Sequence, residues 1–207
     1  KLCECQMFIP SVAEQKKVAS FLEKLDQRIE KQRQLVETLK SYKRGAQSAI
    51  FQEDKKEAQI IKIGDVTQCF SGGTPKSSIA SYYGGHIPFI RSGELHQTHT
   101  ELFLTDEGLL SSSAKLVHKG DLLYALYGAT SGEVAISKID GAINQAILCI
   151  RSETINIQYL AYWLDYQKRD IVTRMLQGGQ GNLSAELVKD LSLPVPSSDT
   201  QQKRADF

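Results

Sequence analysis

Cysteine is scarce in this sequence, and the few cysteines form no pattern typical of a covalent or metal framework. The four stand at positions 3, 5, 69 and 149, a spacing that fits neither a disulfide scaffold nor a zinc site. We interpret Cys69 and Cys149 as reduced, small apolar residues within strands. No export signal occupies the first residues, so the sequence favours a cytoplasmic protein. The first residue is not Met, as expected of a fragment or a processed product.

Long apolar runs and an excess of one charge are also absent. No run approaches the roughly 20 apolar residues that span a bilayer, so no membrane segment is expected. The formal net charge is +1. Residues 12–57 carry 11 Lys and Arg against 8 Asp and Glu, whereas residues 58–190 carry 11 against 13. The second region therefore cannot bind DNA as a uniformly basic surface, and would need a local patch or a more basic partner.

Motifs of catalysis and nucleotide binding are missing as well. The stretches "GGTPKSS" and "GATSGE" lack the spacing of a phosphate-binding loop, and no G-x-S-x-G elbow is present. His96 and His99 are close in sequence but have no third ligand at a useful spacing, so we expect surface residues and no metal site. The sequence therefore indicates a protein without catalytic activity or a cofactor of its own.

A heptad pattern occupies the first quarter of the chain. Apolar positions recur every 3.5 residues over more than four heptads, which is typical of a coiled coil. This seam consists of Val18, Leu22, Leu25, Ile29, Gln32, Val36, Leu39, Lys43, Ala46 and Ile50. Ser11 and Glu14 fit a helix-capping box. We predict a helix from about Val12 to Phe51, then a charged break at 52–58, with the spacer segment as a whole covering 11–57. The polar seam positions either fix the register with a partner or are tolerated on the surface.

Short β-like runs dominate the remainder. We predict strands at 60–66, 86–90, 114–126, 132–137 and 146–151. Two helices interrupt this pattern: one at 156–177 capped by Asn156, and a shorter one capped by Ser184. Strands with few, unevenly spaced helices indicate an α+β fold, here a long exposed helix followed by a compact mixed domain at 58–196.

One phrase occurs at both ends of the chain. "IPSVAEQKKVASF" (9–21) is repeated in register as "VPSSDTQQKRADF" (195–207), 186 residues later. We interpret each copy as a joint where a domain is followed by a helix, with Ser11 and Ser197 as the caps. Residues 1–10 are then the tail of a preceding domain, and residues 197–207 begin a second spacer helix.

The loops of the domain are rich in Gly, Ser, Thr, Asn and Gln. Glycine lets backbone N–H groups approach a ligand, and short polar side chains suit phosphate contacts and base-edge readout. Ordinary turns have the same composition, so both interpretations remain open. Arg91 follows a predicted strand and could reach a guanine, or could pair with Glu94. Lys76 could contact a phosphate or be solvated.

The order of several motifs resembles the specificity subunits of type I restriction–modification systems. After the long helix come "SGGTPK", "IPFIRSGEL", "KGDLLYALYGATSGEVAI", "INQAI", "GGQGNLS" and "LPVP", over nearly the whole chain. In that family, a target-recognition domain alternates with a long helix twice per subunit. The resemblance identifies this chain as a C-terminal half or a half-length form with one recognition domain.

The resemblance implies recognition of double-stranded DNA without catalysis. The domain would read one half of a split target and dock methyltransferase subunits that carry S-adenosylmethionine, and a restriction subunit would join the full complex. It also implies that the loops at 71–76, 91–94, 127–132 and 177–184 face DNA or a partner. Within them, the candidate DNA-binding residues are Ser71, Gly72, Gly73, Thr74, Lys76, Arg91, Ser92, Tyr127, Thr130, Ser131, Gln177, Gln180 and Asn182.

A second hypothesis is a coiled-coil assembly protein whose domain binds protein and not DNA, because the heptads support either function equally. In both cases the apolar seam predicts pairing with another helix, as a homodimer or within one chain.

Overall fold

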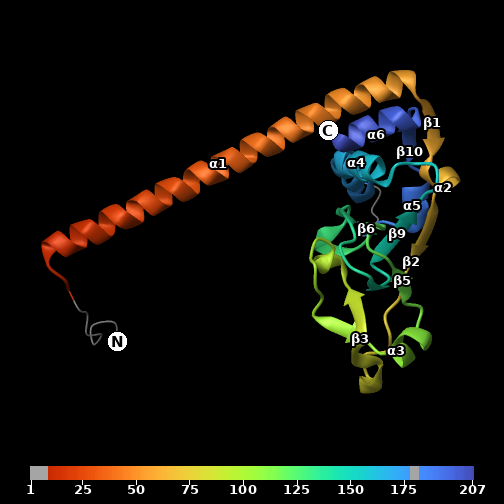
Figure 1. Ribbon diagram of the computed structural model, residues 1–207, viewed down its shortest axis with the longest axis horizontal. Helices are drawn as coiled ribbons and strands as arrows, with labels where there is room; N and C mark the ends of the chain where they lie inside the picture. Colours follow the sequence, from red (N-terminus) through yellow and green to blue (C-terminus); the bar gives the residue numbers. More distant parts are fainter. Residues whose placement is uncertain (1–8, 178–181) are drawn as a thin grey trace. The chain divides into compact units, whose positions relative to one another are not determined.

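The computed structural model describes residues 9–177 and 182–207, with the elements labelled in Figure 1. The chain divides into two units, residues 1–46 and 47–207. The long helix α1 (Val12–Glu57) makes up the described part of the first unit and continues into the second. In the described part of the chain, no helix is long and apolar enough to cross a membrane.

The predicted start of α1 is confirmed. The Glu14 backbone N–H donates to Ser11 Oγ at 3.4 Å, and the Ser11 N–H donates to Glu14 Oε2 at 2.9 Å. The two side chains thus satisfy donors that a helix start leaves unpaired. The predicted break at 52–58 is wrong, because α1 continues to Glu57. Lys and Glu are good helix formers, and a charged run alone does not end a helix.

Three small sheets build the second unit. The first pairs β1 (Gln59–Lys62) with β10 (Ser192–Val195), antiparallel. The expected strand at 60–66 is only half right, because residues 63–66 form the helical turn α2 (Ile63–Val66), which buries Ile63. The second sheet has the order β2-β9-β6-β7 and is antiparallel throughout; its strands are β2 (Gln68–Ser71), β9 (Ile147–Arg151), β6 (Leu122–Ala125) and β7 (Val134–Ile136).

The third sheet has the order β4-β3-β8-β5 and contains the parallel pair β3–β8. Its strands are β4 (Leu102–Leu104), β3 (Tyr83–Ile90), β8 (Gly141–Ile143) and β5 (Lys115–Val117). Short helical segments connect the strands: η2 (Ala80–Tyr82), η3 (Ser92–Glu94), α3 (Asp106–Leu110) and η4 (Gly128–Thr130). The sequence did not predict β2, β4, β8 or β10, four strands of three or four residues.

Three further helices complete the unit: α4 (Ile157–Gln177), α5 (Ala185–Lys189) and α6 (Ser198–Asp206). Their predicted caps are confirmed. Asn156 Oδ1 accepts from the N–H groups of Gln158 and Tyr159, and Ser184 Oγ accepts from Leu187. The main core lies between β6, β9 and α4, and includes Leu122, Leu148, Leu160, Trp163 and Leu164. Cys149 is buried in β9, and Cys69 lies in β2, as expected.

The repeated phrase has the same local structure in both copies. The Gln15 amide donates to the Pro10 carbonyl at 2.8 Å, and the Gln201 amide donates to the Pro196 carbonyl at 2.9 Å. In each copy a helix follows, α1 or α6, with a serine at its cap. Both copies therefore start a helix with a capping serine and with the same glutamine-to-proline hydrogen bond.

Candidate nucleic-acid interface

Strand directions bring the predicted loops to one end of the domain. β2 ends at Ser71, opposite Leu148, and β6 ends at Ala125, opposite Ile147. Both strands therefore end beside the start of β9. The chain enters β9 through the segment 144–146, so this segment lies next to the loops that follow β2 and β6.

The first loop, 71–76, contacts this segment directly. The Gly73 N–H donates to the Ile143 carbonyl at 3.2 Å, and the Thr74 hydroxyl donates to Gln145 Oε1 at 2.6 Å. A Cβ on Gly72 would lie 1.8 Å from the Ile143 carbonyl oxygen, and one on Gly73 would lie 1.9 Å from Ser113 Oγ. Close approach of the protein itself therefore requires glycine at both positions. Lys76 is exposed at the end of the loop.

The loop 127–132 joins the same segment on its other side. The Leu126 N–H donates to the Ala146 carbonyl at 2.8 Å. Within the loop, the Thr130 hydroxyl donates to the Tyr127 carbonyl at 3.4 Å, and the Ser131 hydroxyl donates to the Leu126 carbonyl at 3.1 Å. Tyr127 is half-buried against the main core. The predicted Tyr127, Thr130 and Ser131 thus shape this loop in the free protein.

The last predicted loop reaches the same place through its C-terminal part. The Leu183 N–H donates to the Leu126 carbonyl at 3.0 Å, and the neighbouring Asn182 is exposed. Gln180 and the side chain of Gln177 lie outside what the structure describes.

The loop 91–94 arrives through the parallel pair of the third sheet. Ile90 of β3 lies beside Ile143 of β8, so the residues after both strands emerge at the same end. The Arg91 guanidinium pairs with Glu94, 3.1 Å from each carboxylate oxygen, and with Glu101 at 2.5 Å. Of the two alternatives for Arg91, the structure contains the local carboxylate pair. Ser92 opens η3 and is half-buried.

Glu94 anchors this loop. Its side chain is 6% exposed, and its carboxylate accepts hydrogen bonds from Arg91 and from the backbone N–H of Glu101. Burial raises the pKa of the Glu94 carboxyl, but the hydrogen bonds from Arg91 and from the two backbone groups outweigh burial, and the pKa is lowered. Glu94 is therefore a buried carboxylate that orders the turn after β3.

We call residues 71–76, 91–94, 127–132, 144–146 and 182–184 the loop edge. Its centre, 144–146, was not among the predicted site residues, although the motif "INQAI" that contains it was noted. Gln145 is the exposed residue of that segment. The sequence does contain a signal for this segment: two adjacent amide residues, Asn144 and Gln145, separate two apolar runs.

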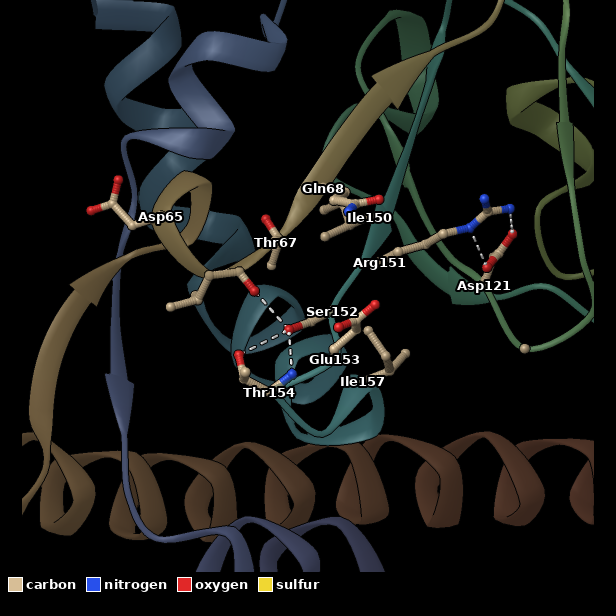
Figure 2. Close-up of a pocket in the computed structure, with 12 residues that line it drawn as sticks. Asp65, Thr67, Gln68, Asp121, Ile150, Arg151, Ser152, Glu153, Thr154 and Ile157 are labelled. Carbon is tan, nitrogen blue, oxygen red and sulfur yellow. Dashed lines mark hydrogen bonds and ion pairs between the residues drawn. The ribbon is translucent and has the colours of Figure 1, made fainter.

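A pocket occupies the opposite end of β2 and β9, where Gln68 lies beside Arg151 (Figure 2). Two of its charged side chains, Arg151 and Asp121, are paired with each other. The Arg151 guanidinium pairs with Asp121, at 2.9 Å from Oδ1, and lies 5.1 Å from the centre of the Phe70 ring. Burial raises the pKa of the Asp121 carboxyl, whereas the Arg151 hydrogen bond and the His118 N–H lower it, and the lowering prevails. The Arg151–Asp121 pair therefore connects β9 to the residue that precedes β6.

No group of His, Cys, Asp and Glu in the described ranges could hold a metal ion. Burial raises the pKa of the Cys149 thiol to about 12, so this cysteine is not a thiolate at neutral pH.

The coiled-coil seam is exposed over most of its length. Val18, Leu22, Leu25, Ile29, Val36 and Leu39 are between 41% and 56% exposed, and Gln32 is also exposed. Two seam residues differ: Ala46 is half-buried, and Ile50 packs against the core of the second unit. The free apolar seam therefore ends before Ile50, since that side chain already has its partner.

Comparisons with known proteins agree on one family. Residues 55–207 match the model of the type I restriction modification DNA specificity domain. A relative, the type I restriction enzyme MjaIX specificity subunit of Methanocaldococcus jannaschii, is 28% identical over 159 residues, which cover 72% of this chain and 37% of that protein.

Solved structures show the same fold at low sequence identity. The HsdS subunit from Thermoanaerobacter tengcongensis matches with a TM-score of 0.59 at 17% identity, over 96% of this chain and 50% of its own. The type I restriction-modification S subunit from M. genitalium matches with a TM-score of 0.67 at 19% identity, over 95% and 53%. The chain thus spans about half the length of these structures, or less for the curated relative. With the family model matching most of its length, this chain belongs to the family of type I restriction–modification DNA specificity domains.

Proposed function

We propose that the chain recognises one half of a bipartite DNA target, as part of the specificity subunit of a type I restriction–modification complex. The observation that carries this proposal is the convergence of the predicted loops on the segment 144–146, from strands of two different sheets. Exposed amide and hydroxyl groups on a rigid strand scaffold suit base-edge readout. Recognition without catalysis is the role that family membership supports.

The partners follow from the same proposal. Methyltransferase subunits would supply S-adenosylmethionine and the methyl transfer, and a restriction subunit would complete the complex. The net charge of +1 also favours a shared interface, since partner subunits can provide much of the phosphate contact. The exposed seam of α1 would pair with a second helix, from another copy or from the same longer chain. A cytoplasmic location is part of this proposal.

The orientation of the domain on DNA can be tested with two exposed lysines. Lys76 lies on the loop edge, whereas Lys119 precedes β6 at the opposite end. If the loop edge faces DNA and Lys76 contacts a phosphate, Lys76→Ala should reduce the slope of log binding constant against log salt by about one. Lys119→Ala should leave the slope unchanged. A slope that changes for Lys119 and not for Lys76 would place DNA at the other end.

A second candidate function rests on the exposed seam alone: an assembly protein that binds other proteins through its domain. A gel shift of duplex DNA with and without a methyltransferase subunit separates the two functions. DNA recognition predicts a specific shift once that subunit is present, whereas a protein-binding domain would add nothing to the shift that the methyltransferase causes by itself.

A further inference from the structure

One polar pair at the loop edge joins two exposed side chains. The Thr74 hydroxyl donates to Gln145 Oε1 at 2.6 Å, across 71 residues of sequence, and both side chains are exposed. A hydrogen bond between exposed side chains adds little to the stability of the fold, because water competes for the same groups. An ordered, exposed pair at the meeting point of several loops is the arrangement that a contact surface requires.

The backbone beneath this pair is held from several directions. The Ala146 N–H donates to Asn144 Oδ1 at 3.1 Å, and the Ile147 N–H donates to the Asn144 carbonyl at 3.2 Å. The Ala146 carbonyl accepts from Leu126, the Gly73 N–H donates to the Ile143 carbonyl, and Gly72 packs closely on β8. Gln145 thus starts from a fixed turn, and Thr74 limits the rotation of its amide. Recognition of a base needs such support, since a side chain placed loosely loses specificity.

Gln145 keeps hydrogen-bonding groups that several other polar residues of the loop edge have already used. The hydroxyls of Thr130 and Ser131 donate within their own loop, and Arg91 is held by two glutamates. In the described part of the chain, neither N–H of the Gln145 amide has a protein partner, and its carbonyl oxygen keeps a second lone pair. A donor next to an acceptor matches the major-groove edge of adenine, where N7 accepts and the N6 amino group donates.

We propose that Gln145 reads the adenine of one A·T pair in the major groove, with Thr74 as the positioning residue that orients its amide. This assignment rests on the proposed DNA recognition. It adds a specificity-determining residue and the base that it recognises.

The experiment is a selection from randomised DNA duplexes by the complex of the full chain with a methyltransferase subunit, followed by sequencing of the bound DNA. With Gln145→Ala, one adenine position of the selected site should lose its preference by about 10- to 100-fold, while other positions keep theirs. With Gln145→Glu, the same position should shift toward cytosine, because a carboxylate accepts from the cytosine N4 amino group but cannot donate to N7. Both substitutions are at an exposed residue, and thermal unfolding checks that the fold is retained.

Two further variants separate positioning from general effects. Thr74→Val removes the hydroxyl at nearly constant volume and should weaken the base preference at the same position by less than Gln145→Ala does. Thr74→Ser keeps a hydroxyl and should retain the wild-type preference. Gln68→Ala is the matched control, since Gln68 is an exposed glutamine at the opposite end of β2.

Each remaining outcome contradicts a defined part of the proposal. If Gln145→Ala weakens binding equally for all DNA sequences, Gln145 contacts the DNA backbone and does not read a base. An unchanged site in both Gln145 variants would remove the residue from recognition. Either result leaves the proposed function intact, provided that the wild-type complex selects a site. If the wild type itself selects no sequence, the proposed function fails and the assignment fails with it.

Discussion

At the residue scale, Gly72 is required by close packing. Its Cα lies so near β8 that a Cβ would be 1.8 Å from the Ile143 carbonyl oxygen, a backbone atom that cannot rotate away. Gly93, on the loop after β3, has nothing within 4 Å of such a Cβ. We expect Gly72→Ala to lower the free energy of unfolding by about 1–3 kcal/mol. Gly93→Ala should change it by about 0.5 kcal/mol or less. Urea denaturation measures both, and equal effects would contradict the packing role.

Two buried tyrosines form a second matched pair. The Tyr159 hydroxyl lies 3.1 Å from Asp54 Oδ2 and 2.9 Å from the Pro194 carbonyl, and Asp54 is only 3% exposed. The Tyr124 hydroxyl, also buried, has no hydrogen-bond partner in the described ranges. Tyr159→Phe should therefore cost about 1–2 kcal/mol of unfolding free energy, because it removes a donor from a buried carboxylate. Tyr124→Phe should be neutral or stabilising, and a larger cost at Tyr124 than at Tyr159 would contradict this account.

The loops that the sequence predicts as DNA-facing lie together at one end of the domain, and their contacts come from residues distant in sequence. Gly72 and Gly73 are predicted DNA-binding residues, and in the structure they also lie against Ile143 and Ser113. The neighbour of a glycine depends on which strands pair, and pairing between β2, β9 and β8 is not visible in one sequence. The sequence allows Arg91 either a base contact or a carboxylate pair. The structure pairs its guanidinium with Glu94 and with Glu101, which is ten residues away in the sequence.

At the element scale, we expect the exposed apolar seam of α1 to pair with another helix. Leu25 and Ile29 lie on the seam and are 41% and 49% exposed, whereas Leu35 lies off the seam and is 56% exposed. We expect the double substitution Leu25→Glu and Ile29→Glu to abolish self-association at micromolar concentration, because it places charges within an apolar interface.

Sedimentation of the wild type, the double variant and Leu35→Glu tests this expectation. The wild type and Leu35→Glu should sediment as the paired species. A monomeric wild type, or equal loss of pairing in Leu35→Glu, would count against the seam as the interface.

Local signals predicted helices better than strands. The caps at Ser11, Asn156 and Ser184 could be found because each depends on residues within three positions. The strands β4 and β8 have three residues each, too few for alternation to appear. The turn at α2 interrupts the run "IIKIGDV", which is apolar enough to suggest a strand, because Ile63 is needed in the core. Tertiary packing decided these elements.

At the scale of the whole molecule, the repeated phrase forms the same kind of helix start at two places 186 residues apart. The second copy shows how the joint connects to a domain: the buried Gln201 accepts from the Asn156 N–H at 2.9 Å, at the start of α4. Gln201 also donates to the Pro196 carbonyl, and Gln15 donates in the same way to the Pro10 carbonyl. The repeat is visible in the sequence, whereas the hydrogen bonds that its glutamines make are visible only in the structure.

The central claim is that this domain reads part of a DNA sequence through its loop edge. The most direct measurement is selection of randomised duplexes by the wild-type chain in complex with a methyltransferase subunit. The account predicts enrichment of one split sequence, whose two defined parts are separated by a spacer of fixed length. Bound DNA with the same base composition as the starting library, although the complex binds it, would contradict the account.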